Sequence, residues 1–499
     1  MSILQKFSGL AILFSAMLSQ IAVAAPTVTL SKKAGPPTSK ILVSGRGFAP
    51  NVGVDIYFGT KDEALVVTNG RGEFVKTKIY TPRTAHPGKH WVSALERNND
   101  KGAQEPFLVR TNWSQFRFSP SHEGVNPYEN VVSTQTVGRL ELKWTYAGDF
   151  NFVYGISSPA VANGVVYVGT TEGGANSLLA LDAETGKYVW SFGAPSKVVA
   201  SPALANHAVY FGAYGGYAYA LNASTGAELW DYKVKSYEID SSPAVADGLV
   251  YIGAEDGNMY ALNADDGTNV WTYTTGGQVS CSPAVASGLI YFGSYDGFLA
   301  LNASTGAKVW AYTANEVDSA PAVANGVVYV GSFDGNIYAL NATNGALLWT
   351  YKTSDWVFSS PAVANGIVYV ASLNHNLYAL NAKTGALLWT YATAGSISSS
   401  PAIANGVVYV GSDDNNVYAL NANTGALLWS YTTGGGVDSS PAVSDGMVYV
   451  DSGDGNVYAF GLGGTPTSEQ AASKRPALNG LRPDPSLKPF QPKRNGIGE

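Results

Sequence analysis

Residues 421–464 read NANTGALLWSYTTGGGVDSSPAVSDGMVYVDSGDGNVYAFGLGG. This stretch begins with an Asn-Ala-x-Thr-Gly turn that leads to Trp429, but it ends without a second copy of the turn or of the Trp. Its short apolar runs are separated by Gly, Asn and Asp, and each run is too short for a helix. The final unit therefore lacks a strand that another part of the chain has to supply.

The same pattern recurs upstream at intervals of 38 to 43 residues, each unit carrying one Pro-Ala element. The prolines of these elements are Pro159, Pro202, Pro243, Pro283, Pro321, Pro361, Pro401 and Pro441. Repeats of about forty residues with four short runs each predict the blades of a β-propeller. Proline suits the first run because it cannot donate a ladder hydrogen bond, and the innermost strand of a blade has a free edge that faces the channel.

A Trp follows four residues after the glycine of each turn, and we expect its ring to pack against the neighbouring blade. These residues are Trp190, Trp230, Trp271, Trp310, Trp349, Trp389 and Trp429. An eighth, Trp144 in RLELKWTYAG, comes before the first Pro-Ala element. We expect this segment to pair beside NVYAF and close the ring, because an open array would leave its end sheets unpaired. The prediction is an all-β fold with an eight-bladed propeller of four-stranded blades over residues 139–462.

The N-terminal part of the chain has a different texture. Residues 1–25 place Lys6 before a short apolar run that ends in small residues, which predicts a signal peptide and a secreted or periplasmic location. The run is too short for a membrane span, and no Cys follows it as a site for a lipid anchor. Residues 26–110 alternate apolar and polar residues between Gly, Pro and Asn turns, which predicts a small antiparallel sandwich. Residues 111–138 are expected to form a linker, and residues 463–499 a disordered tail.

Composition narrows the range of partners. The formal net charge is -7, and no concentrated basic face occurs in the predicted folded region. Nucleic acid is therefore excluded as a partner, because phosphate binding needs such a face. Cys281 is the single Cys of the chain, so no internal disulfide can form.

Two stretches resemble known families. KILVSGRGFAPNVGVDIYFG resembles the opening of bacterial immunoglobulin-like domains of the TIG type. ALNASTGAELW, ALNADDGTNVW, ALNATNGALLW and their sister segments resemble the tryptophan-docking repeat of pyrroloquinoline-quinone-type propellers. That family includes quinoprotein alcohol dehydrogenases and non-catalytic relatives such as the outer-membrane assembly lipoprotein B, so the resemblance implies the ring more tightly than the function.

The resemblance also implies elements that this chain lacks. The enzymes of the family stack the quinone against a disulfide between adjacent Cys residues, which a single Cys cannot form. The chain has no haem-attachment C-x-x-C-H motif, and it has no Cys at the predicted mature N-terminus, where the lipoprotein relatives carry their lipid. The sequence therefore favours a non-catalytic scaffold over a quinone enzyme.

Function is expected where the repeats differ from one another. The fourth residue before each proline is almost always aliphatic and is expected in the core, whereas the fifth and third residues vary. Because alternate residues of a strand face opposite sides, the variable pairs are expected to ring one mouth of the channel. The candidate ligand-binding residues are Tyr154, Lys197, Glu238, Asp240, Gln278, Glu316, Asp318, Trp356, Phe358 and Asp438.

The acidic members of this set are candidate metal ligands, namely Glu238, Asp240, Glu316 and Asp318. Carboxylates prefer hard cations such as calcium, and aromatic rings stack on flat or charged groups, so calcium or a cationic or sugar-like ligand is expected. A water-filled channel entrance lined by polar residues that bind nothing is the alternative.

No catalytic residue is predicted. The first hypothesis is a secreted or periplasmic binding scaffold that presents the channel mouth to a protein or a small ligand. The alternative is a quinone-dependent alcohol dehydrogenase with an atypical site.

Overall fold

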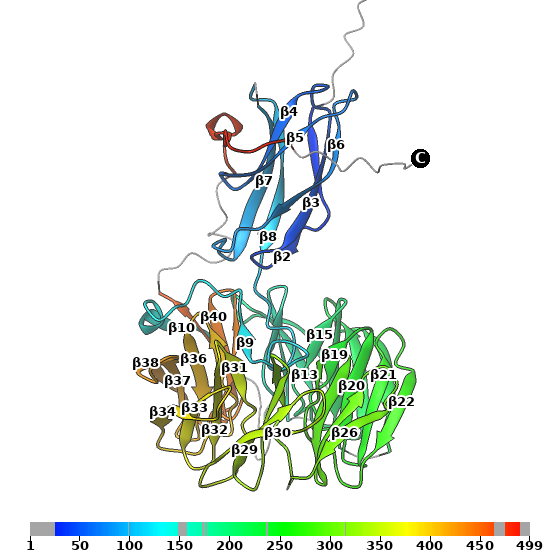
Figure 1. Cartoon of the computed structure of the whole chain (residues 1–499), viewed down its shortest axis with the longest axis vertical. Helices are drawn as coiled ribbons and strands as arrows, with labels where there is room; N and C mark the ends of the chain where they lie inside the picture. Colours follow the sequence, from blue (N-terminus) through cyan, green and yellow to red (C-terminus); the bar gives the residue numbers. More distant parts are fainter. Residues whose placement is uncertain are drawn as a thin grey trace, which may run out of the picture.

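The computed structural model of the chain describes residues 25–97, 99–147, 157–171, 174, 177–235, 238–314, 316–463 and 475–489. Nearly all of its regular structure is β-strand, with two short 3-10 helices, η1 (Val137–Arg139) and η2 (Leu478–Gly480), in the described part. Figure 1 shows two bodies, a sandwich of β1 to β8 and a ring of sheets made by the later strands. Within the described ranges, no helix is long and apolar enough to cross a membrane. The predicted signal peptide lies almost entirely outside these ranges.

The N-terminal body consists of two sheets, in the orders β1-β3-β6 and β2-β8-β7-β4-β5. The strands are β1 (Thr27–Leu30), β2 (Ala34–Gly35), β3 (Lys40–Arg46), β4 (Gly53–Phe58), β5 (Lys61–Val67), β6 (Phe74–Tyr80), β7 (Gly88–Glu96) and β8 (Gly102–Val109). Alternate residues of β3 are buried, as the period of a half-buried strand requires. Ile41 and Val43 of β3 pack with Ile56, Val92 and Phe107 of the other sheet in one apolar cluster, so the two sheets share a core.

Within the described residues, the second body is built from eight sheets, and each sheet contributes four strands to the ring. The innermost strands are β11 (Ala160–Ala162), β15 (Ala203–Ala205), β19 (Ala244–Ala246), β23 (Ala284–Ala286), β27 (Ala322–Ala324), β31 (Ala362–Ala364), β35 (Ala402–Ala404) and β39 (Ala442–Ser444). Each contacts the innermost strand of the next sheet, and β39 contacts β11. The sheets therefore form a closed ring, as a β-propeller does.

Three further strands follow outward in each sheet. The second strands are β12 (Val165–Gly169), β16 (Ala208–Ala213), β20 (Leu249–Ala254), β24 (Leu289–Ser294), β28 (Val327–Gly331), β32 (Ile367–Ser372), β36 (Val407–Gly411) and β40 (Met447–Asp451). The third strands are β13 (Leu178–Asp182), β17 (Tyr217–Asn222), β21 (Asn258–Asn263), β25 (Gly297–Asn302), β29 (Asn336–Asn341), β33 (Asn376–Asn381), β37 (Asn416–Asn421) and β41 (Asn456–Leu462). The outer strands are β14 (Tyr188–Phe192), β18 (Glu228–Lys233), β22 (Asn269–Thr274), β26 (Lys308–Tyr312), β30 (Leu347–Lys352), β34 (Leu387–Ala392), β38 (Leu427–Thr432) and β10 (Leu140–Ala147).

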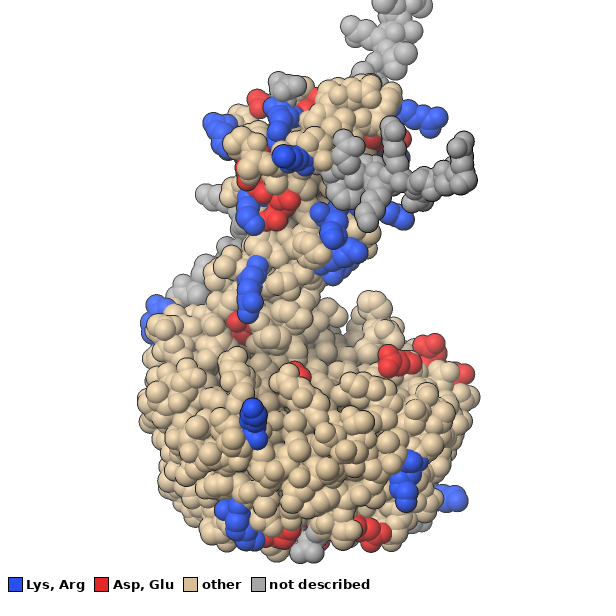
Figure 2. All heavy atoms as spheres, viewed as in Figure 1, with Lys and Arg blue, Asp and Glu red and all other residues tan. Residues whose placement is uncertain are grey.

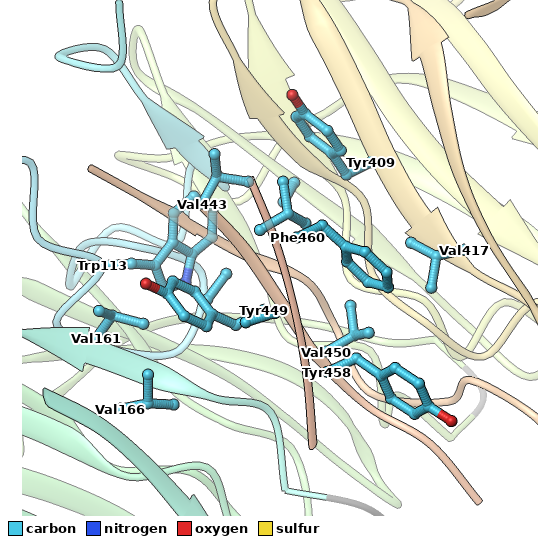
Figure 3. Packing of buried hydrophobic residues seen from close by; sticks show 14 of the residues in the cluster. Trp113, Val161, Val166, Tyr409, Val417, Val443, Tyr449, Val450, Tyr458 and Phe460 are labelled. Atoms are coloured by element: carbon cyan, nitrogen blue, oxygen red, sulfur yellow. The ribbon is translucent and has the colours of Figure 1, made fainter. Parts of the chain in front are cut away.

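The last sheet takes its outer strand from the start of the ring, as the sequence predicts. β10 pairs antiparallel with β41, from Leu140 opposite Leu462 to Ala147 opposite Asn456. Figure 3 shows the seam that results, where Tyr449 of β40 lies beside Val161 and Val166 of the first sheet in one buried cluster.

Each turn glycine packs against the Trp ring of the preceding sheet. The indole of Trp144 is 8% exposed and donates a 3.1 Å hydrogen bond to the carbonyl of Ala183 in the turn of the neighbouring sheet. Gly186 of that turn has a φ of 68°, and a Cβ on it would lie 2.6 Å from the indole. The glycine is needed both for its left-handed backbone and for the space that the ring occupies. The sheet completed by β10 has no such turn, so Trp429 donates to the carbonyl of Leu140 instead.

Residues 111–130, expected to be a linker, instead bind the free edges of the inner strands at the end of the ring next to the sandwich. β9 (Val125–Asn126) pairs parallel with β35, and the other inner strands are reached through hydrogen bonds of this segment. These contacts join Trp113 to Val161, Ser114 to Leu204, Gln115 to Val245, Pro120 to Val285, Ser121 to Val323, Glu123 to Val363, and Asn126 to Val443. The segment satisfies backbone groups that an innermost strand otherwise leaves unpaired.

Residues 475–489 differ from the expected disordered tail. They pack on the five-stranded sheet of the sandwich, where Leu481 is 4% exposed. Figure 1 shows this segment, in red, beside the sandwich and away from the ring.

Candidate functional site

The variable residues lie on the strand ends that point away from the sandwich. In seven of the eight sheets the structure describes the whole segment that enters the innermost strand, and this segment lies next to the turn between the second and third strands of the same sheet. A backbone N–H of the turn donates to the carbonyl of the fifth residue before the proline. The donor and acceptor pairs are Tyr214 and Lys197, Glu255 and Glu238, Tyr295 and Gln278, Phe333 and Glu316, Leu373 and Trp356, Asp413 and Ser396, and Gly453 and Gly436.

In these seven sheets a third variable residue therefore joins the predicted pair at the mouth. The turn residues are not among the predicted site residues, because hairpin geometry alone accounts for Asp, Asn and Gly in such turns. The available signal was the position before the turn's Asp, Asn or Gly, which changes from Tyr to Glu, Phe, Leu or Asp between repeats. We call this surface the channel mouth and define it by the variable pairs and these turn residues.

The residue between the two members of each pair is core, as predicted. Val198, Ile239, Val279, Val317, Val357, Ile397 and Val437 are all 0% exposed. They pack against the end of the neighbouring second strand, where glycine is usual. A Cβ on Gly212, for example, would lie 2.2 Å from the side chain of Ile239.

Carboxylates gather on one side of the mouth. Carboxylate oxygens of Glu238, Asp240 and Glu255 all lie within 4.8 Å of one another. Oδ1 of Asp240 is buried and has no hydrogen-bond partner among the described residues. Burial and the charges of Glu238 and Asp240 raise the pKa of Glu255 to about 7. Burial and the charge of Glu316 raise the pKa of Asp318 to about 6.

Lys197 partly balances this charge. The ammonium of Lys197 lies 3.9 Å from the ring centroid of Tyr214. Burial and the Asp240 carboxylate raise the pKa of Tyr214, to which Asp240 is hydrogen-bonded. This corner of the mouth thus already holds an alkylammonium group over an aromatic face, and its charge acts on the Asp240 carboxyl.

Aromatic rings occupy the adjacent part of the mouth. Phe333 stacks on Trp356 with ring centroids 5.0 Å apart and planes at 9°, and Phe358 lies 4.4 Å from Phe333. Trp356 remains 48% exposed. Because the backbone of Phe333 is bonded to that of Glu316, this aromatic platform directly adjoins the carboxylates.

Two further acidic residues lie near the seam of the ring. Burial and the hydrogen-bonded carboxyl of Asp413 raise the pKa of the predicted residue Asp438 to about 7. Asp451, which was not among the predicted site residues, is 4% exposed at a position where most second strands have a glycine as their last or next-to-last residue. Burial raises the pKa of Asp451 well above the usual range. Tyr154 lies outside the described residues.

The single thiol does not fit the quinone site of the enzymes. Cys281 is buried between two sheets, where its Sγ donates to the carbonyl of Ser319 at 3.3 Å. Burial raises its pKa, so the thiol is neutral. The stacking disulfide that the quinoprotein resemblance implies has no counterpart here.

Comparison with known proteins points to two kinds of relative. The family described as outer membrane protein assembly factor BamB matches residues 130–238, 214–321, 299–400 and 392–478. The dehydrogenase subunit of a quinone alcohol dehydrogenase from Gluconobacter oxydans (strain 621H) is 29% identical over 129 residues. That match covers 24% of this chain but only 16% of the enzyme.

Solved structures show the same fold. BamB from Moraxella catarrhalis is 21% identical with a TM-score of 0.55, and the match covers 64% of this chain and 99% of that one. The quinohemoprotein alcohol dehydrogenase ADHIIG from Pseudomonas putida HK5 is 19% identical with a TM-score of 0.61, covering 73% and 82% of the two chains. At these identities the likeness concerns the propeller fold alone.

Proposed function

Since this chain belongs to the family described as outer membrane protein assembly factor BamB, we propose that it is a binding scaffold that acts in the periplasm or outside the cell. In this proposal an eight-bladed propeller over residues 139–462 stands behind an immunoglobulin-like module over residues 26–110. The propeller presents its channel mouth to a protein or a small ligand. The family's role in outer membrane protein assembly favours a protein partner.

The arrangement of sheets supports both parts of this description. Eight sheets carry four ring strands each in the described residues. In the sandwich, β1 pairs with β3 while β2 pairs parallel with β8, so the first strands divide between two sheets. Such edge switching is compatible with an immunoglobulin-like sandwich.

The observation that carries the proposal is a contrast among the repeats of this chain. Some positions hold the same kind of residue in every repeat, whereas others differ from repeat to repeat. Core positions such as Val279 and Val317 repeat because the fold needs them. At the mouth, by contrast, the repeats place carboxylates next to an exposed aromatic platform. A cluster of carboxylates and an exposed Trp give the ring no evident stability, so they are the positions that a ligand would use.

Calcium is the proposed ion of the mouth. Glu238, Asp240 and Glu255 would hold it, and Asp318 and Glu316 stand beside them. Oxygen-only donors suit calcium, which takes six to eight such ligands in flexible geometry. A divalent cation would also relieve the repulsion that raises the pKa of Glu255.

The test compares melting temperatures with calcium and with a chelator. Calcium should raise the melting temperature of the wild type, because an ion that binds only the folded state stabilises it. The variant Asp240→Asn with Glu255→Gln should lose that rise, whereas Asp231→Asn on the exposed outer strand β18 should keep it. If calcium does not shift the melting temperature of the wild type, the calcium proposal is rejected and the aromatic platform remains as the site to test.

The dehydrogenase alternative is favoured by the Gluconobacter match and opposed by the isolated Cys281. It is tested by adding the quinone and calcium to the purified chain. The scaffold proposal expects no dye-linked alcohol oxidation and no bound-quinone spectrum. Alcohol oxidation together with a bound-quinone spectrum would overturn the scaffold proposal.

A further inference from the structure

The C-terminal segment, residues 475–489, occupies a surface far from the channel mouth. It follows the ring's last strand, β41, in the sequence, yet it lies on the sandwich at the other end of the molecule (Figure 1). Its contacts with the sandwich fall into an apolar anchor and a set of hydrogen bonds to the segment's backbone.

The apolar anchor is Leu481. It packs against Tyr57 and Leu95, with Leu478 alongside, in a cluster of its own. The main core of the sandwich contains no residue of the segment. The sandwich therefore has a complete core without the segment, and Leu481 fills a site on its surface.

Most of the polar contacts recognise the segment's main chain. Gln104 Nε2 donates to the carbonyl of Pro476 at 2.9 Å, and Arg97 donates to that of Asp484 at 3.3 Å. The backbone N–H of Asp484 donates to Asp62 Oδ2 at 2.9 Å. Pro489 bridges in parallel to Leu65 of β5, the edge strand of the five-stranded sheet.

The sandwich groups that make these contacts are held in place by their own neighbours. Two nitrogens of Arg97 donate to the fully buried Asp55 carboxylate at 2.6 to 3.1 Å, and a further N–H is left for the segment. Gln104 Nε2 also donates to Ser93 Oγ at 2.9 Å. Preorganised donors reduce the entropy that a ligand loses on binding.

Arg475 of the segment contacts the sandwich through its side chain, and Asp484 fixes the shape of the segment itself; Arg475 Nε donates to Gln104 Oε1 at 2.5 Å. Arg475 lies over the ring of Trp91, with its guanidinium carbon 5.2 Å from the centroid. Asp484 Oδ1 accepts hydrogen bonds from the N–H and the hydroxyl of Ser486, which fixes the Asp-Pro-Ser turn. The segment thus presents an Arg, a Leu anchor and a short turn to a surface that binds its backbone.

We propose that this face of the sandwich, defined by Tyr57, Asp62, Trp91, Arg97 and Gln104, is a peptide-binding surface that residues 475–489 occupy in cis. Backbone hydrogen bonds at a sheet edge with a pocket for one side chain are a common mode of peptide recognition. The tether to the ring keeps the segment at a high effective concentration, so a second peptide gains access only when the segment is displaced. The segment also ties the sandwich to the ring at a second point, besides residues 110–113.

The experiment starts from the full chain with a specific protease site inserted between Gly463 and Arg475. After cleavage, the fragment is removed by gel filtration, and a fluorescent peptide of residues 475–489 is added while its anisotropy is followed. The peptide should bind the stripped chain about tenfold or more tightly than the uncut chain, because the tethered copy competes in the latter. A peptide with Leu481→Asp should bind the stripped chain about tenfold or more weakly, since its anchor is lost.

A second variant covers the case in which the fragment stays bound after cleavage. The uncut chain with Leu481→Asp should admit the labelled wild-type peptide, whereas the uncut chain with Arg482→Ala, an exposed position, should not. Hydrogen exchange of β3 and β7 monitors the sandwich core throughout. Loss of protection in these strands on removal of the segment, or no peptide binding to either the stripped chain or the Leu481→Asp chain, would overturn the proposal.

Discussion

The two ends of the ring use the same eight inner strands in different ways. At the end next to the sandwich, residues 111–130 bind most of the strands through backbone hydrogen bonds and two of them through the side chains of Gln115 and Asn126. The turns at this end are nearly alike. At the channel mouth, the same strands begin with side chains that change from sheet to sheet. One end therefore completes the fold, whereas the other is free to vary, and the following predictions test this division.

The largest effect is expected where closure of the ring is broken. Trp144→Ala removes an indole that is buried at the seam and hydrogen-bonded to Ala183. We expect it to lower the free energy of unfolding by about 3 to 5 kcal/mol, as other large-to-small core changes do. Urea denaturation followed by tryptophan fluorescence and circular dichroism measures the change.

Trp429→Ala is the matched control for closure. Trp429 takes the same place in its sheet but is only partly buried and bonds to Leu140 rather than to a turn. Its loss should cost less than that of Trp144. Equal costs would show that neither the deeper burial of Trp144 nor its bond to the turn sets the cost of removing the indole.

A smaller effect is expected at the sandwich end. Arg117 is buried and donates to the carbonyls of Pro361 and Pro401 at 2.6 Å or less. Arg117→Ala would leave these carbonyls unpaired, and we expect a loss of about 1 to 3 kcal/mol of unfolding free energy. The rise in melting temperature with calcium should remain, because the mouth is not touched. A variant that loses the calcium response as well would contradict the independence of the two ends.

Ionisation of carboxyls at the channel mouth should lower the stability of the ring as pH rises. Glu255 and Asp318 titrate near pH 7 and 6 when folded, against about 4 when unfolded. The folded state thus binds more protons between pH 4 and 7, so stability should fall as pH rises through this window and then level off.

The measurement is the melting temperature in chelator across this pH range. Asp62, Asp438 and Asp445 have raised pKa values in the same window, so the informative quantity is a difference between variants. Glu255→Gln with Asp318→Asn should fall less steeply than the wild type. Parallel curves of melting temperature against pH would mean that ionisation of these two carboxyls does not destabilise the folded ring.

Sequence reasoning succeeded where side chains repeat and failed where backbone groups act. The eighth Trp predicted correctly that β10 pairs with β41. The last repeat lacks the Trp-bearing outer strand of the other repeats, and the segment around Trp144 has no inner strands of its own. The role of residues 111–130 was missed, since most of their bonds to the inner strands are made by main-chain atoms, which leave no side-chain pattern. Leu481 was missed because one apolar residue in a Pro-rich segment has no periodicity. Glu255 was missed because its turn is explained by hairpin geometry alone.

The smallest expected effect concerns a chain of serine hydroxyls inside the ring. The backbone N–H of the residue before each proline donates to the hydroxyl of the serine at the same place in the next sheet. The links run from Ser158 to Ser201, Ser242 and Ser282, and from Ala320 to Ser360, Ser400, Ser440 and back to Ser158, at 2.8 to 3.1 Å. The link from Ser282 is missing, because the next sheet has Ala320 in place of a serine.

Ala320→Ser should supply the missing acceptor. Ala320 is 3% exposed, so the added hydroxyl would stand close to the N–H of Ser282 and away from bulk water. The gain is expected to be about 0.5 to 1.5 kcal/mol, the net contribution of one hydrogen bond. Ser360→Ala, which removes the acceptor of the Ala320 N–H, is the mirror variant and should cost at least as much, since it strands a buried donor. Urea denaturation of the two single variants and of the wild type gives the comparison, and a destabilised Ala320→Ser chain would show that the junction is too tightly packed to admit a hydroxyl.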